Sequence, residues 1–418
     1  MPITHKTPLL DELEKGPWPS FVKDIKRAAD EGGSPTANDL LGQLELSYEQ
    51  KIGHWKHGGI VGVFGYGGGV IGRYSDVPHL FPSVTHFHTL RINQPASKFY
   101  SSEQLRTLAD IWDKHGSMIT NMHGSTGDII FLGCRTEALE PCFADLTANG
   151  FDLGGSGSAL RTPSCCVGRA RCEWSCLDTQ DITYNLTMTY QDEMHRPAWP
   201  YKFKFKTSGC PNDCVAAIAR ADCSIIGTWR DEIRINQKEV QNYADAGLDI
   251  QKYVIDLCPA ECMSYQDGEI QINNKKCTRC MHCINVMTKA LRPGTDVGAT
   301  ILIGAKAPIL EGAQMSAVVM PFLKMEKVSD DLDDNYTELK DFIDKLWEWW
   351  DENGKNRERV GELIQRLGYR AFLDAVEIDP IPQMIKEPRS NPYIFFLEQD
   401  VEGGWERDLE EYRARHQA

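Results

Sequence analysis

The sequence predicts an α+β fold in which mixed regions of strands and helices are interrupted by a small cysteine-rich domain. Three observations support this fold class. Strand and helix patterns alternate between residues 89 and 150, closely spaced cysteines lie in residues 236–298 between two strand patterns, and helical periodicity dominates residues 334–418. A chain of 418 residues is long enough for several domains of this kind.

Composition restricts the class of function. The net charge of -15 argues against general nucleic-acid binding, because contacts to phosphate backbones require clustered cations. We find no apolar run long enough for a transmembrane segment and no apolar core of a signal peptide, and we therefore expect a cytoplasmic protein. In that setting, 14 cysteines indicate metal or redox chemistry rather than a disulfide framework.

Residues 1–160 are predicted to form an N-terminal arm and a first α+β domain. Residues 1–50 are polar with helical fragments, and residues 58–72 are rich in glycine, which is typical of a turn or of a loop that approaches a ligand closely. Arg73 follows directly. The predicted elements after it are strands at 89–93, 118–119 and 128–132, and helices at 101–116 and 136–146. This order is most of a ferredoxin-like split βαβ unit, and Ser101 and Gln104 form a capping box.

Residues 161–235 hold two pairs of cysteines on either side of a strand with alternating lysine and phenylalanine. The pairs are Cys166/Cys172 and Cys210/Cys214, and the strand runs from Tyr201 to Thr207. Thiolates are suited to iron–sulfur clusters, and four of them hold one [4Fe–4S] cube. On spacing alone, Cys165 and Cys176 compete for the same roles.

The alternation puts Lys202, Lys204 and Lys206 on one face of the strand and the phenylalanines on the other. Lysines on one face are also typical of an edge strand that avoids aggregation. In an acidic chain, however, three lysines next to cysteine ligands and preceded by Arg161 favour a bound anion. Residues 299–333 return to a buried-strand pattern and are predicted to complete this domain.

Residues 236–298 carry the most specific motif in the chain. Cys277, Cys280 and Cys283 are each separated by two residues, and Cys258 with a following proline lies upstream. This is the ligand pattern of a bacterial ferredoxin-type [4Fe–4S] cluster. Cys262 is a competing candidate, and structural zinc is the alternative, although zinc sites usually pair two CxxC or CxxC/His units.

Residues 334–418 are predicted to be mainly helical. The tryptophans at 347, 349 and 350 are expected in the core or at an interface. The apolar segment 391–396 is expected to dock on another subunit.

The two cysteine pairs resemble the cluster motif of sirohaem sulfite and nitrite reductases, and the inserted ferredoxin-type unit makes the chain resemble the alpha subunits of dissimilatory sulfite reductases. This resemblance implies sirohaem and two [4Fe–4S] clusters per chain. For the cluster coupled to the haem it favours Cys166, Cys172, Cys210 and Cys214. Cys214 would be the bridge to the haem iron. For the second cluster it favours Cys258, Cys277, Cys280 and Cys283. The remaining thiols are expected in the core: Cys134, Cys142, Cys165, Cys176, Cys223 and Cys262.

The resemblance also implies an anion site. Its expected catalytic cations are Arg91, Arg161, Lys202, Lys204 and Lys206, and its expected contacts to the haem carboxylates are Arg73 and Arg220. Assimilatory relatives carry a Thr-Thr-Arg-Gln motif where this chain has residues 121–127, so haem contacts are not transferred to that segment.

The activity that the resemblance implies is the six-electron reduction of sulfite to sulfide. The implied partners are a homologous beta subunit in an α2β2 assembly and a small sulfur-carrier protein with a C-terminal cysteine. In this family the basic residues of one subunit face the haem whose cluster is held by the other. Three alternatives remain open: the reverse reaction on reduced sulfur, reduction of nitrite, and a haem-free electron-transfer subunit.

Overall fold

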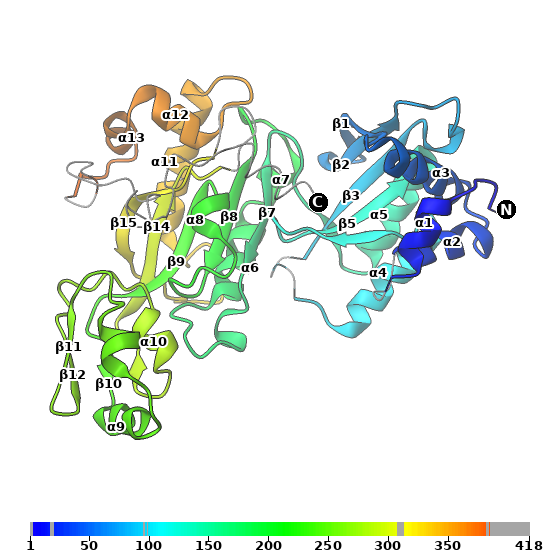
Figure 1. Ribbon diagram of the computed structural model, residues 1–418. Coiled ribbons are helices and arrows are strands. Elements are labelled where there is room, and N and C mark those ends of the chain that lie inside the picture. Colours follow the sequence, from blue (N-terminus) through cyan, green and yellow to red (C-terminus); the bar gives the residue numbers. More distant parts are fainter. Residues whose placement is uncertain are drawn as a thin grey trace, which may run out of the picture. The chain divides into compact units, whose positions relative to one another are not determined.

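An antiparallel sheet forms the framework of the N-terminal part of the chain in this computed structural model, which describes residues 3–16, 21–94, 97, 99–306, 313–381 and 384. The strands follow the order β1-β2-β3-β5-β4, and β6 pairs with β3 (Figure 1). The strands are β1 (Trp55–Val63), β2 (Tyr66–Ser75), β3 (Phe87–Asn93), β4 (Thr120–Met122), β5 (Ile129–Cys134) and β6 (Asp152–Leu153). The helices of this part are α1 (Pro8–Glu14), α2 (Phe21–Asp30), α3 (Pro35–Gln50), α4 (Ser102–His115) and α5 (Leu139–Ala148), with short turns η1 (Pro82–Val84) and η2 (Thr136–Ala138).

The expected alternation of strands and helices is confirmed here, with two corrections. The capping box of Ser101 and Gln104 does begin α4. The strand expected at 118–119 lies at Thr120–Met122 instead, because Met118 has a positive φ of 65° that a strand cannot accommodate. The glycine-rich segment is not a loop but forms the β1–β2 hairpin. Gly69 is needed there because a Cβ would lie 2.7 Å from the Cβ of Leu153.

A second, mixed sheet follows the order β15-β14-β9-β8-β7. Strand β8 is parallel to both β7 and β9, and β14 is antiparallel to both β9 and β15. The strands are β7 (Leu160–Cys165), β8 (Phe203–Ser208), β9 (Cys223–Trp229), β14 (Val297–Ile303) and β15 (Ala317–Leu323). The associated helices are η3 (Gly168–Ala170), α6 (Thr179–Thr189), α7 (Gln191–His195) and α8 (Ala217–Arg220).

The lysine-bearing strand β8 is therefore not an edge strand, since it lies between β7 and β9. The alternative explanation of its lysines, protection of an exposed sheet edge, is excluded by this position.

The cysteine-rich segment is inserted between two neighbouring strands of the second sheet. Because β9 and β14 pair from Trp229 and Val297 onward, the chain leaves the sheet and returns beside the strand that it left (Figure 1). The inserted elements are β10 (Arg234–Ile235), α9 (Gln237–Asp245), the π-helical turn η4 (Gln251–Ile255), β11 (Met263–Gln266), β12 (Glu269–Ile272), α10 (His282–Val286) and β13 (Leu291–Arg292). Their buried side chains, among them Val240, Ile270 and Ile284, form a core that also includes Cys210 and Trp229 from outside the insert.

Among the described residues, three helices follow the second sheet: α11 (Thr337–Asn353), α12 (Val360–Leu367) and α13 (Tyr369–Ala375). Trp350 is fully buried and Trp347 nearly so, which confirms the expectation that these side chains belong to the core. The apolar segment 391–396 lies outside the described residues.

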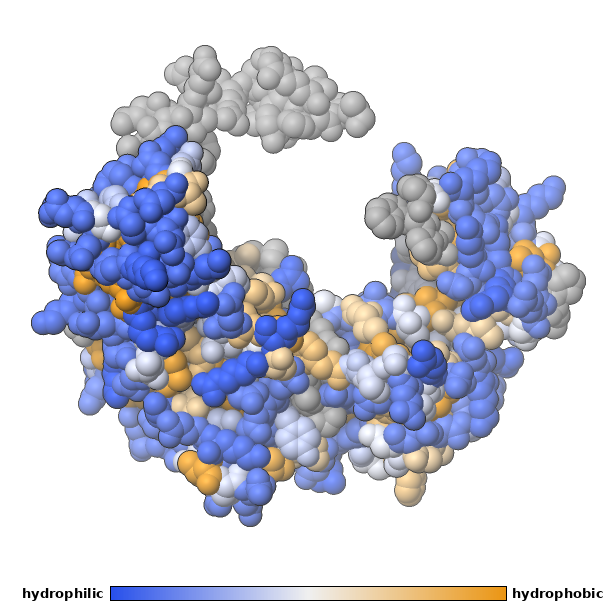
Figure 2. Space-filling view, turned by 90° about the horizontal axis from the view of Figure 1, so that it is seen from below, coloured by the Kyte–Doolittle hydropathy of each residue, from blue (hydrophilic) through white to orange (hydrophobic). Residues whose placement is uncertain are grey.

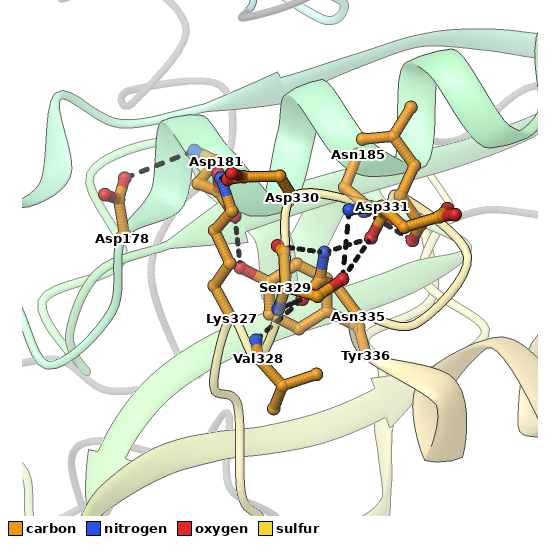
Figure 3. A network of polar contacts seen from close by, with 11 residues as sticks. Asp178, Asp181, Asn185, Lys327, Val328, Ser329, Asp330, Asp331, Asn335 and Tyr336 are labelled. Carbon is orange, nitrogen blue, oxygen red and sulfur yellow. Dashed lines mark hydrogen bonds and ion pairs between the residues drawn. The ribbon is translucent and has the colours of Figure 1, made fainter.

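The loop of residues 327–336 ties the start of α11 to α6 (Figure 3). The Asn335 amide donates to the carbonyl of Asp331 at 2.6 Å, which closes the loop on itself. The Tyr336 hydroxyl donates to Asp181 of α6 at 2.5 Å. Because α6 packs on β7 and β8, this network supports the two strands that carry the basic residues.

Hydrophilic residues dominate the face shown in Figure 2, and apolar residues appear there in small separate groups. Among the described helices we find none that is both long and apolar enough to cross a membrane.

Candidate functional site

Two parallel strands bring the predicted basic residues together. In the β7–β8 register, Arg161 lies opposite Lys204, and Ser164 lies opposite Lys206. Residues that are neighbours across parallel strands project from the same face, so the arginine and the lysines share one side of the sheet.

Aromatic packing fixes which face this is. Phe203 and Phe205 of β8 are buried, and their rings lie 5.4 and 5.8 Å from that of Trp347 on α11. Because side chains alternate along a strand, burying the phenylalanines against α11 turns the lysines to the opposite face. Trp347 therefore orients the basic side chains, although the tryptophan itself lies on the opposite face of the sheet.

The cations on this face are crowded and largely out of water. Arg161 is 9% exposed and Lys206 only 1%. Burial, followed by the charge of neighbouring Arg359, lowers the pKa of Lys204 to about 7. Burial and the nearby Arg91 likewise lower the pKa of Arg161. Buried like charges destabilise a fold unless an opposite charge is bound, which indicates an anion site.

Arg91 joins this group from the first sheet. Its guanidinium donates to the carboxylate of Asp128 at 2.7 Å, and the Asp128 side chain is fully buried. The hydroxyl of Thr162, the neighbour of Arg161 on β7, donates to the other oxygen of that carboxylate. One buried acid thus orients Arg91 and links the two sheets.

Arg73 lies on β2, which pairs with the strand of Arg91. It donates to the hydroxyl of Thr89 at 3.3 Å, and burial, followed by the charge of Arg91, lowers its pKa. Arg220, in contrast, is exposed at the end of α8, and no contact among the described residues joins it to the other cations.

The segment 121–127, to which no role was assigned from sequence, contacts the basic residues. Lys204 Nζ donates to the hydroxyl of Ser125 at 2.6 Å. His123 shares a hydrogen bond of 2.8 Å with the Thr126 hydroxyl, and burial and the charge of Arg91 lower its pKa to about 4. His123 is thus a neutral group beside the cations at neutral pH.

Sequence reasoning also missed Arg359 and Asp222. They form a buried ion pair with two hydrogen bonds of 2.7 and 2.6 Å, and Arg359 influences the pKa of Lys204. The two residues are 137 positions apart, and no local motif marks either of them.

The first four candidate cluster ligands lie on the two loops that follow β7 and β8. The backbone N–H of Gly209 donates to the sulfur of Cys166 at 3.1 Å. Burial raises the pKa of the Cys210 thiol to about 11, with further contributions from the neighbouring thiols of Cys172, Cys214 and Cys166. Thiols that influence one another across two loops match the donor set of an iron–sulfur cluster.

The competing thiols of this region are more deeply buried. Cys176 is 2% exposed within the apolar core, and burial raises its pKa to about 12. Cys165 is 3% exposed, and burial raises its pKa to about 11. Cys166 and Cys172 are instead partly exposed on the loop after β7, which leaves their sulfurs accessible and favours them over the two core thiols.

In the insert, five cysteines line one cavity, namely Cys258, Cys262, Cys277, Cys280 and Cys283. Among the described residues, no three metal-binding side chains converge on a point suited to a single ion. The thiols instead surround a space, as the ligands of a polynuclear cluster do.

Cys258 and Cys262 are adjacent, with their sulfurs 3.5 Å apart. Burial raises the pKa of Cys258, but backbone N–H groups directed at its sulfur outweigh this effect and lower it overall, whereas burial and its neighbour raise the pKa of Cys262 to about 12. The backbone N–H groups stabilise a thiolate at Cys258, which favours Cys258 over Cys262 as the ligand.

Comparison with known proteins identifies the family of the chain. Residues 156–381 match the nitrite and sulphite reductase 4Fe-4S domain, and residues 81–149 match the nitrite/sulfite reductase ferredoxin-like half domain. The chain is 54% identical to the alpha subunit of the dissimilatory-type sulfite reductase of Nitratidesulfovibrio vulgaris, with 99% of each chain covered. It is 46% identical to that of Allochromatium vinosum, over 98% of this chain and 97% of the other.

A solved structure shows the same fold. The crystal structure of dissimilatory sulfite reductase I superposes with a TM-score of 0.85 at 53% identity, over 99% of this chain and 100% of the other. A more distant similarity, 21% identity over 87% of this chain and 94% of the other, links it to the beta subunit of the dissimilatory-type sulfite reductase of Archaeoglobus fulgidus. The chain belongs to the family of dissimilatory sulfite reductase alpha subunits.

Proposed function

We propose that this chain is the alpha subunit of a sirohaem and iron–sulfur enzyme that reduces sulfite to sulfide. The observation that carries the proposal is the crowded cation group Arg91, Arg161, Lys204 and Lys206, of which the last three lie on β7 and β8, the strands that lead into the two cysteine loops. The relatives that cover almost the whole chain are named as sulfite reductases, which favours sulfite over nitrite and reduction over the reverse reaction.

Sirohaem and iron–sulfur clusters, when bound, supply the electrons and the metal centre at which sulfur is reduced. We propose two [4Fe–4S] clusters per chain. Cys166, Cys172, Cys210 and Cys214 would hold the cluster coupled to the haem, with Cys214 as the bridge. Cys258, Cys277, Cys280 and Cys283 would hold the cluster of the insert.

The chain's own contribution is electrostatic. Arg161, Lys202, Lys204 and Lys206 attract the sulfite dianion and stabilise the negative charge on its oxygens. Lys204 Nζ, with a pKa of about 7, also suits a proton donor at neutral pH, since each oxygen of sulfite must leave as water. Arg73 and Arg91 supply further positive charge for anionic groups, and Arg220 is a weaker candidate for this role because it is exposed.

The similarity to beta subunits supports a beta-subunit partner. We propose an α2β2 assembly in which the basic residues of this chain face the haem anchored by the beta subunit. A small sulfur-carrier protein with a C-terminal cysteine is the proposed acceptor of the product. We also propose a cytoplasmic location, because 14 free thiols are suited to a reducing compartment.

The Lys204→Ala variant tests this function. Removing the amine from the centre of the cation group should lower the turnover of sulfite by roughly 100-fold, as expected when a charged group that acts on developing charge is lost. Iron and acid-labile sulfide contents should stay unchanged. Lys23→Ala, which removes an exposed lysine of α2, is the matched control. Unchanged sulfite kinetics in the Lys204 variant would contradict the proposal.

A further inference from the structure

A pair of asparagines joins the loop between Cys210 and Cys214 to the inserted domain. Asn212 Nδ2 donates to Asn285 Oδ1 at 3.1 Å, and Asn285 Nδ2 donates back to Asn212 Oδ1 at 2.7 Å. Each amide uses one donor and one acceptor, so the two side chains form a closed pair. Two simultaneous bonds fix both the separation and the relative orientation of the segments that carry them.

The position of this pair relates it to both sets of cysteines. Asn212 is two residues from Cys210 and two from Cys214, whereas Asn285 is two residues after Cys283 on α10. The segments are 73 residues apart in sequence. The pair therefore connects the loop of one proposed cluster directly to the helix of the other.

A second polar contact joins the insert to the other cysteine pair. Arg292 of β13 forms an ion pair of 2.7 Å with Glu173, the residue after Cys172. Between the two contacts lies an apolar core that includes Cys210, Trp229 and Met281. Apolar contacts hold surfaces together without direction, so polar contacts such as these two, and that of Arg279 with the Arg230 backbone oxygen, define the register.

The neutral amide side chains of the asparagine pair also suit a position close to cluster ligands. Both residues are exposed, so their hydrogen bonds contribute only modestly to stability. Neutral amides provide a directional link and add no charge of their own beside Cys210, Cys214 and Cys283, where charge would change a reduction potential.

We propose that the Asn212–Asn285 pair, supported by Glu173–Arg292, is a positioning device that sets the distance between the two clusters of this chain. It thereby controls the rate at which one electron passes from the reduced insert cluster to the oxidised cluster that the cysteines of the β7 and β8 loops would hold, with no bond made or broken. This inference rests on the proposed function, since it requires both clusters. Electron transfer slows steeply with distance, and a misplacement of about 1 Å is enough to impair a positioned reaction strongly.

The test uses the anaerobically purified complex with its beta subunit and the variants Asn212→Ala, Asn285→Ala and the double variant. Reduced viologen serves as the one-electron donor, and rapid-freeze EPR follows the two clusters of the chain. Inter-cluster transfer should be roughly ten-fold slower in each single variant. The double variant should be no slower than either, because both changes break the same pair. Asn242→Ala, which alters an exposed asparagine of α9, should leave the rate unchanged.

Two further readouts distinguish a change in the distance between the clusters from damage to the clusters themselves. The iron content and the reduction potentials should match those of the unaltered complex, while the magnetic interaction between the two reduced clusters should weaken in the variants. Asn285→Ser, with a shorter polar side chain, repeats the test with less change to α10.

The variants can hold both clusters and still show unaltered transfer rates and unaltered magnetic interaction. That result would overturn the inference but leave the proposed function intact. Absence of a cluster from the insert of the unaltered complex would overturn the inference together with the proposed cluster content.

Discussion

Lys204 combines the features expected of a group that both binds an anion and donates a proton. It lies opposite Arg161 across two parallel strands, it contacts Ser125 of the first domain, and burial brings its pKa close to neutral. A lysine with an ordinary pKa would stay charged at any physiological pH and would donate its proton less readily.

The pH dependence of the reaction should report this lysine. Because its pKa in the folded protein is lowered to about 7, Lys204 loses its charge as the pH rises above that value, and kcat/KM for sulfite should fall. Lys204→Arg keeps a charge that does not titrate in this range and should move the alkaline limb to higher pH. Sulfite's own ionisation is common to both enzymes, so the difference between their profiles measures Lys204. Identical alkaline limbs would rule out this role.

The same pKa predicts how stability changes with pH. In the unfolded chain the lysine titrates at its ordinary value of about 10.4. Between about pH 7 and that value the unfolded state binds more protons than the folded state, so the free energy of unfolding contributed by Lys204 rises with pH. Below pH 7 both states are protonated, and the cost of burying the cation is fully present.

At the scale of single elements, the helices behind the second sheet determine where the basic residues point. Trp347 of α11 fixes the face of β8, and Arg359, at the start of α12, is bonded to Asp222, which precedes β9. Both contacts join the C-terminal helices to strands that lie far earlier in the chain.

Asp222→Asn tests the contact between α12 and the sheet. The ion pair is almost completely buried, so removing the carboxylate charge leaves Arg359 buried without its partner and should destabilise the chain by about 3 to 5 kcal/mol. The thermal unfolding midpoint of the complex measures this loss. Asp192→Asn, which removes an exposed ion pair with Arg196, should barely move it. Equal midpoints for the two variants would show that the buried pair has no special importance.

Within the insert, the choice between two adjacent thiols is testable. Cys258→Ala should remove about four irons per chain, because the four-cysteine ligand set is broken. Cys262→Ala should keep them, because Cys258, whose thiolate is favoured by backbone N–H groups, still completes the ligand set. Iron and acid-labile sulfide assays on both variants decide the question, with Cys142→Ala, in the core of the first domain, as the control. Iron loss from the Cys262 variant alone would reverse the assignment.

At the scale of the whole molecule, the sequence predicted the features that depend only on residues close together in the chain. The spacing of Cys277, Cys280 and Cys283 and the alternation in Phe203–Ser208 depend on neighbouring residues, and the cavity and the strand both match them. Asp222 and Arg359 could not be found in this way, because their pairing exists only after β9 and α12 have packed together.

The glycine-rich hairpin shows a second limit of local patterns. Glycines usually indicate turns, but in β2 they permit a close approach to Leu153 and to the segment around Pro197. The importance of residues 123–126 was likewise hidden, because the contact of Ser125 with Lys204 crosses between the two sheets and that of Thr126 with Arg91 joins residues 35 positions apart.

The absorption spectrum of the anaerobically purified complex, recorded before and after addition of sulfite, tests the central claim most directly. We predict haem bands superimposed on broad iron–sulfur absorption, and a shift of the haem bands when sulfite binds. Iron–sulfur absorption without a haem band would contradict the proposed function, would favour an electron-transfer subunit, and would leave the buried cations without an anion to bind.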